Sequence, residues 1–89
     1  MVGKILEEIK ASLVNVDLHE ASYEQNGYHL SVVVQNGNGP EAAKFFKDKM
    51  FYLEDMFCVD YIEYLEIVYF FNRYKDLCRV KVTRKVDVA

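Results

Sequence analysis

Hydrophobic residues recur at helical spacing in two separate stretches of the chain. In residues 2–12 they lie three or four positions apart, and charged side chains occupy the positions between them. A second such stretch surrounds Pro40, which suits the first position of a helix because no amide hydrogen is needed there. We therefore expect helices over residues 2–12 and 37–54, with a kink or restart near Asp48, where the pattern is interrupted.

Between these helices the hydrophobic period changes to two, which is typical of β-strands. Apolar and polar residues alternate from position 14 to 18, and a second strand is expected over residues 28–35. The segment between the two strands ends at Gly27, which can supply the left-handed third residue of a three-residue loop. Such a loop would pair Leu18 with Val34 and keep the apolar residues of both strands on one face.

Three more strands are expected in the second half of the chain, over residues 57–61, 65–72 and 77–86. The links between them are short, which implies mostly antiparallel pairing. The element order is then helix, strand, strand, helix and three strands. This order predicts an α+β fold of two layers, formed by a single domain over residues 1–89. The clearest break in the chain is the glycine- and asparagine-rich segment at residues 36–39.

The strand over residues 64–71 is apolar on both of its faces. An antiparallel sheet in a small domain usually keeps one face in water, so two helices would have to cover one face each to bury this strand. We interpret the excess as an aromatic surface reserved for a partner protein. The alternatives are one helix on each face, or aromatic side chains that cap the sheet edges. The aromatic candidates for partner contact are Tyr69, Phe70 and Phe71.

Charge divides the chain into two unequal parts. Residues 1–70 contain five Lys and twelve Asp or Glu and carry −7, whereas residues 71–89 carry +4. Alternation in the last strand places Arg79, Lys81 and Lys85 on one side, which predicts an exposed basic row for an acidic partner. Nucleic acid is not expected as the main partner, because the basic residues are few and accompany a larger acidic body.

With 52% hydrophobic residues, the composition is typical of a folded domain with one core. No apolar run reaches the ~20 residues of a membrane helix, and no signal peptide is expected because acidic residues follow the first apolar positions at once. These features predict a cytoplasmic protein without direct membrane insertion. Cys58 and Cys78 are expected to be reduced and buried, with a redox pair or ligand pair as the alternative.

The residues offer little for catalysis. The glycines before Pro40 lack the Lys-Ser or Lys-Thr of a phosphate loop, and the sequence contains no Cys-x-x-Cys or His-x-x-x-His pair. His19 and His29 are expected too far apart to share an ion. The acids within residues 54–66 could form a paired-carboxylate catalyst or a cation site, but we interpret them as a solvated or interfacial acidic patch. We therefore expect no catalytic residue, no metal and no cofactor.

The second half of the chain resembles one protein family. Residues 50–61, followed closely by the strand at 65–71, are similar to the 30 kDa subunit of respiratory NADH–quinone oxidoreductase (complex I). Asp55 and Asp60 match the two acids of the family's Leu…Asp-Leu-x-x-Val-Asp run. Glu66 to Tyr69 match the core of its next strand, and Arg79-Val80-Lys81-Val82 matches its basic strand. The resemblance covers residues 40–86.

The resemblance implies a role and a set of partners. Family members hold no redox centre, but they pack against the large catalytic subunit near the iron–sulfur subunits and support electron transfer. By resemblance, this protein is a non-catalytic scaffold or accessory subunit of a complex I-like oxidoreductase or a membrane-bound hydrogenase, peripheral to the membrane through its complex. Contact roles are implied for Asp55, Asp60 and Tyr69, and the aromatic and basic patterns add Phe70, Phe71, Arg79 and Lys81.

The family's C-terminal signature, which contains a Tyr-Asp-Met-Phe-Gly segment, does not follow the basic strand before Ala89. We therefore expect a fragment, or a shortened relative of the type found in energy-converting hydrogenases. Two other functions stay open. One is a free-standing interaction domain that forms a homodimer through an exposed strand or aromatic face. The other is a small enzyme or ligand-binding domain that uses the acidic cluster.

Overall fold

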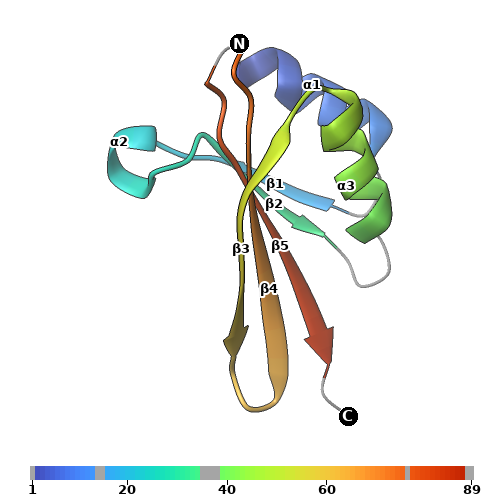
Figure 1. The fold of residues 1–89 in the computed structure, drawn as a ribbon, viewed down its shortest axis with the longest axis vertical. Helices are drawn as coiled ribbons and strands as arrows, with labels where there is room; N and C mark the ends of the chain where they lie inside the picture. The colour runs from blue at the N-terminus through green and yellow to red at the C-terminus, as the bar shows by residue number, and fades with distance from the viewer. Residues whose placement is uncertain (1, 14–15, 35–38, 76, 88–89) are drawn as a thin grey trace.

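The computed structural model describes residues 2–13, 16–34, 39–75 and 77–87, which form one five-stranded sheet with helices packed on it (Figure 1). The strand order is β1-β2-β5-β4-β3, and all neighbours are antiparallel except β2 and β5. The expected α+β class and element order are confirmed. The elements are α1 (Val2–Ser12), β1 (Val16–Glu20), α2 (Tyr23–Asn26), β2 (Leu30–Val34), α3 (Gly39–Asp48), β3 (Tyr52–Asp60), β4 (Tyr64–Asn72) and β5 (Val80–Asp87).

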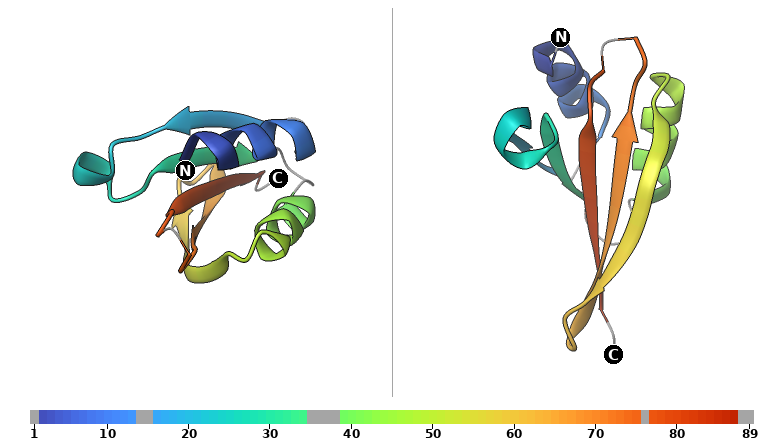
Figure 2. Two further views of the ribbon diagram at one scale, coloured as in Figure 1. Left: turned by 90° about the horizontal axis from the view of Figure 1, so that it is seen from above. Right: turned by 60° about the vertical axis from the view of Figure 1, so that its left-hand side comes forward.

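Both longer helices, α1 and α3, pack on the same face of the sheet (Figure 2). Ile5 and Ile9 of α1 and Phe46 of α3 belong to one buried cluster, together with alternate residues of the strands such as Leu30 and Val82. We call this side the helix face. The arrangement of one helix on each side is therefore not found, and neither α1 nor α3 covers the opposite face, which we call the open face.

Phe46 is the centre of the contact between α3 and the sheet. Its side chain is completely buried, and its ring stacks on that of Phe71 with the centroids 5.0 Å apart. The rings of Phe45 and Phe51 meet it edge-on at 5.2 Å. Such ring pairs add to the stabilisation that comes from burying apolar area.

The predicted three-residue loop between β1 and β2 is wrong. Residues 23–26 form the short helix α2, and Leu18 pairs with Val32 instead of Val34. The shift is two residues, so every side chain keeps its predicted face. Gly27 does adopt the expected left-handed conformation, with φ of 80°, but it ends α2. Strand positions 14 and 35 and the expected break at residues 36–38 lie outside the described residues.

Helix α3 ends at Asp48, well before the predicted residue 54. Met50 adopts a φ of 68°, its amide donates to the Lys47 carbonyl at 3.0 Å, and the Phe51 amide donates to the Phe46 carbonyl at 2.9 Å. This bonding pattern is a Schellman motif, with the left-handed residue occupied by methionine where glycine is usual. The chain is thereby released into β3, which begins at Tyr52, five residues earlier than predicted.

The hairpin formed by β3 and β4 extends beyond the two longer helices and makes the molecule elongated (Figure 1), with extents of 40 × 27 × 20 Å. Strand β3 lies at the edge of the sheet. Its register with β4 shifts between Leu53 and Asp55, which makes Glu54 a bulge residue.

Candidate functional site

The exposed apolar side chains of the β3–β4 hairpin form the candidate interaction surface. Most residues of β3 are exposed, although its sequence is largely apolar. At the turn that joins β3 to β4, Ile62 is 90% exposed, the highest value for any large hydrophobic residue in the described part of the chain. We define the hairpin surface as Leu53, Met56, Phe57, Tyr61 and Ile62.

Ile62 occupies a strained backbone position. Its φ is 76°, and the Glu63 amide donates to the Tyr61 carbonyl at 2.8 Å across it. These features define a γ-turn of the positive-φ type, which is rare for any residue and costly for a β-branched one. A position of this kind costs about 1–3 kcal/mol. Ile62 is therefore unfavourable to the isolated fold in two ways, through its backbone and through its exposed side chain.

Three contacts stabilise the turn around Ile62. The Tyr61 amide donates to the Tyr64 carbonyl at 3.0 Å, and the two tyrosine rings stack with centroids 4.9 Å apart. Oδ1 of Asp60 accepts the Ile62 amide at 2.8 Å. Asp60, which the sequence suggested as a partner contact, thus supports the turn. These contacts hold the backbone of the turn in a conformation that leaves the Ile62 side chain exposed.

Acidic side chains lie at the turn and along the edge strand. The charge of Glu66 is the main cause that raises the pKa of Tyr61 above its ordinary value. Asp55, the second acidic candidate, accepts the Met56 amide at 2.9 Å. Together with the bulge at Glu54, this bond occupies part of the free edge of β3, a common way to limit strand-to-strand aggregation.

The predicted basic row lies on the open face, but its members are already engaged. Arg79, Lys81 and Lys85 stand over the rings of Phe70, Tyr28 and Tyr64 at 4.2, 5.4 and 4.3 Å. These distances are within the range of cation–π contacts. The row therefore carries positive charge over an aromatic layer and is not a freely solvated strand face.

Arg79 makes the largest number of these internal contacts. Its Nε lies 2.6 Å from Oε1 of Glu54, and its Nη1 donates to the Gly27 carbonyl at 2.9 Å. Hydrogen bonds from Asn72 and then Arg79 hold the pKa of Glu54 below its ordinary value. Arg79 thus links the start of β5 to β3 and to the loop before β2.

The three aromatic candidates of β4 do not all lie on the same face of the sheet. Phe71 is a core residue, so it does not belong to any surface. Tyr69 is half-buried at the margin of the same core. Phe70 points to the open face, where its ring lies 6.1 Å from that of Phe57 and 6.2 Å from that of Tyr28. The structure therefore brings together Phe70, Arg79 and Lys81 on the open face.

The described residues hold no group of three or more His, Cys, Asp or Glu side chains placed to bind a metal ion. Nδ1 of His29 accepts the Arg79 amide at 3.0 Å, and the imidazole ring stacks on Tyr23. Cys78 is buried as expected, but Cys58 is exposed, contrary to the expectation, because it lies on the projecting part of the edge strand.

Two residues that matter here were not found from the sequence. Ile62 carried no signal, because a turn residue with positive φ is expected to be Gly, Asn or Asp. Arg84 did carry one, since alternation places it on the same side as Val82 and Val86, where a charge is unexpected. It lies on the helix face beside the first turn of α3.

Comparison with protein-family models, with curated proteins and with solved structures gave no significant match. Within the part of the chain that the structure describes, none of the helices combines the length and hydrophobicity that a membrane-spanning helix requires.

Proposed function

We propose that this protein is a non-catalytic accessory subunit that docks on a larger protein through the hairpin surface. The proposal rests on the exposure and the backbone conformation of Ile62. An isoleucine that is 90% exposed and held at a φ of 76° lowers the stability of the isolated protein, so its role lies outside the fold. An exposed apolar side chain at the tip of a projecting hairpin is well suited to fill a pocket in a partner.

The resemblance of residues 40–86 to the 30 kDa subunit of complex I supports the choice of partner. We propose the large catalytic subunit of a complex I-like NADH–quinone oxidoreductase or of a membrane-bound hydrogenase, with iron–sulfur subunits nearby. In this assembly the protein holds neighbouring subunits in place, takes no direct part in electron transfer, and lies on the cytoplasmic side, peripheral to the membrane. The acidic residues around the hairpin turn favour a pocket with a basic rim on the partner.

The test is affinity purification of the tagged protein from its source cells, with the co-purifying proteins identified by mass spectrometry. We expect the wild type to recover a hydrogenase-like or quinone-reductase-like large subunit with iron–sulfur partners. Ile62→Gly removes the side chain and relieves the backbone, so it is expected to fold and to recover at least about tenfold less of that subunit.

Tyr23→Ser is the matched control, because Tyr23 is also an exposed apolar residue but lies on α2, away from the hairpin (Figure 1). This variant is expected to recover the subunit in full. Equal recovery by Ile62→Gly would exclude the hairpin as the docking site. Recovery of the protein alone, as a monomer or homodimer, would reject the accessory role.

A homodimeric interaction domain is the second candidate, favoured by the exposed edge of β3. Two features oppose it. The bulge at Glu54 and the bond from the Met56 amide to Asp55 interrupt the free edge. A symmetric pairing of β3 with itself would also bring the acidic strands of both copies together. Sedimentation equilibrium of the purified protein decides between a monomer and this dimer.

A further inference from the structure

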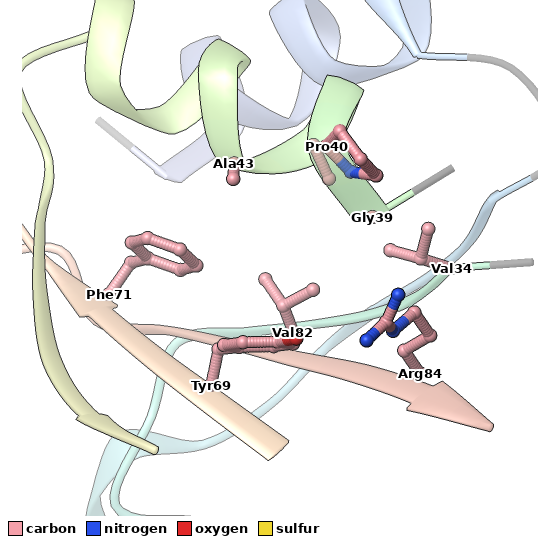
Figure 3. A pocket seen from close by; sticks show the side chains of 9 residues that line it. Val34, Gly39, Pro40, Ala43, Tyr69, Phe71, Val82 and Arg84 are labelled. Atoms are coloured by element: carbon pink, nitrogen blue, oxygen red, sulfur yellow. The ribbon is translucent and has the colours of Figure 1, made fainter. Parts of the chain in front are cut away.

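A cavity of about 300 Å³ lies between the first turn of α3 and the helix face of β2, β4 and β5 (Figure 3). It is remote from the hairpin turn. Its wall is mostly aliphatic and aromatic, and among the described residues that line it only Arg84 is charged. The lining includes Val34, Gly39, Tyr69, Phe71 and Val82.

Arg84 is placed at this cavity by the sheet register. Val34 and Arg84 are paired across β2 and β5, and Val82 is paired with Tyr69 across β5 and β4. Residues two apart on a strand share a face, so Arg84 and Tyr69 are diagonal neighbours on the floor of the cavity. Figure 3 shows the Arg84 side chain directed toward Gly39 and Val34 above this floor.

Close packing against α3 holds the guanidinium in position. A β-carbon at residue 39 would lie 3.2 Å from Nη1 and 3.3 Å from Cδ of Arg84. Any side chain at residue 39 would therefore press on Arg84. Glycine at this position lets the first turn of the helix close over the arginine.

The Nε atom of Arg84 is buried and has no hydrogen-bond partner among the described residues. The ion pairs found among the described residues also leave Arg84 without a carboxylate. A buried donor without an acceptor lowers stability, and more so when it is charged. The sheet thus places a half-buried cation with one unsatisfied donor at the wall of an apolar cavity, which is an arrangement suited to binding an anion.

We propose that this cavity is a binding site for a small monocarboxylic acid with a short apolar body. The carboxylate binds Arg84, whose planar fork of donors matches two carboxylate oxygens. The apolar body lies against Val82 and Phe71, away from water. A single cation in an apolar wall suits a singly charged acid better than a phosphate, and the volume is at the small end of ligand pockets.

The probe for the test is 4-methylpentanoate, compared with its neutral amide at neutral pH. Binding is followed by calorimetry and by the NMR signals of the Val34 and Val82 methyl groups. We expect the acid to bind at least about tenfold more tightly than the amide, because charge-assisted hydrogen bonds are stronger than neutral ones. Equal affinity for the two compounds, or no saturable shift of these methyl signals, would overturn the proposal.

Arg84→Met removes the cation while keeping an apolar side chain of similar length. It is expected to abolish the preference for the acid and to leave the unfolding midpoint of the ligand-free protein equal or higher, because a buried donor without an acceptor is lost. Lys85→Met is the matched control, since it removes the same charge from the next residue, which points to the open face. If Arg84→Met kept the preference, or Lys85→Met lost it, the assignment would be refuted.

Discussion

At the scale of single residues, the molecule places unfavourable groups at two positions that the fold does not need. Ile62 is strained and exposed at the hairpin turn, and the Nε atom of Arg84 is buried without a partner in the described part of the chain. A sequence that specifies its fold consistently avoids such conflicts, and real proteins keep them mostly at functional sites. The two residues lie at separate places in the fold, so the hairpin surface and the cavity are independent.

Replacing Ile62 by glycine is expected to stabilise the isolated protein. Relief of the positive φ outweighs the greater freedom that glycine gives to the unfolded chain, so we expect a gain of about 0.5–2 kcal/mol in the free energy of unfolding. Urea denaturation followed by circular dichroism measures it. Ile62→Val keeps the β-branch and should give no gain. A lower midpoint for Ile62→Gly than for the wild type would show that the turn is not strained.

The ion pair between Glu54 and Arg79 makes part of the stability depend on pH. The pKa of Glu54 lies below its ordinary value of 4.5, chiefly because Asn72 and Arg79 donate hydrogen bonds to the carboxylate. The unfolded state therefore binds more protons than the folded state at acidic pH. The stabilisation is present above pH 4.5 and is lost as the pH falls through the pKa of the folded state.

Glu54→Gln is expected to reduce the free energy of unfolding at neutral pH by less than about 1 kcal/mol, since the pair is partly solvated. The difference from the wild type should shrink as the pH falls below 4.5. Urea denaturation across a pH series measures it, with Glu24→Gln on α2 as the control. A difference that stayed constant with pH would contradict the assigned role of the Glu54 carboxylate.

At the scale of elements, hydrophobic periodicity predicted a helix or strand correctly where the segment buries one face. It failed where local backbone geometry determines the end or the type of an element. Helix α1 was predicted with its bounds, and the faces of β2 and β5 followed from alternation. The end of α3 was missed because Met50 takes the left-handed position of the Schellman motif, which sequence reasoning assigns to glycine. The helix α2 was missed because a four-residue segment has no measurable period.

Only part of the candidate site was predictable from the sequence, because the rest depends on how the helices pack on the sheet. The sequence indicated a surplus of apolar residues around β4, and it pointed to Phe70 and Arg79, which do lie together on the open face. Alternation placed Phe70 and Phe71 on opposite faces, but it did not tell which of these faces the helices cover, so Phe71 was also kept as a contact candidate. That choice depends on the packing of α3, whose Phe46 meets Phe71.

Phe46 anchors α3 to the sheet, and Phe46→Ala is expected to lower the free energy of unfolding by about 3–5 kcal/mol. The loss combines the buried area of a fully buried ring with its three aromatic contacts. It is a large part of the total for a domain of this size. Denaturation measures it, and Phe46→Leu gives a graded value if the alanine variant is unfolded. Phe57→Ala, on the exposed hairpin surface, should cost about 1 kcal/mol or less. Equal losses at the two positions would contradict the placement of the core.

At the scale of the whole molecule, the part of the sheet covered by α1 and α3, which we call the body, and the projecting β3–β4 hairpin have different contacts. The two parts should therefore differ in local stability. Strands β2 and β5 lie between other strands, and their helix-face residues Leu30, Val32, Val80 and Val82 are buried under the helices. The outer part of the β3–β4 hairpin has a free edge and exposed side chains. Local opening requires less free energy where few apolar contacts are broken, so the hairpin is expected to open without unfolding the body.

Amide hydrogen exchange measures this difference directly. We expect the amides of β3 around Phe57 and Cys58 to exchange at least about tenfold faster than those of β2 around Val32. Val68 marks the boundary between slow and fast exchange on β4, because it is only 2% exposed although it faces the open side.

Binding of the proposed partner at the tip should slow amide exchange in the hairpin and leave exchange in β2 unchanged. Binding of 4-methylpentanoate in the cavity should instead slow exchange around Val34 and Val82. Uniform protection along the whole sheet of the free protein would show that the body and the hairpin open as one unit. The expectation of separate opening, which rests on the free edge and the exposed side chains of the hairpin, would then be wrong.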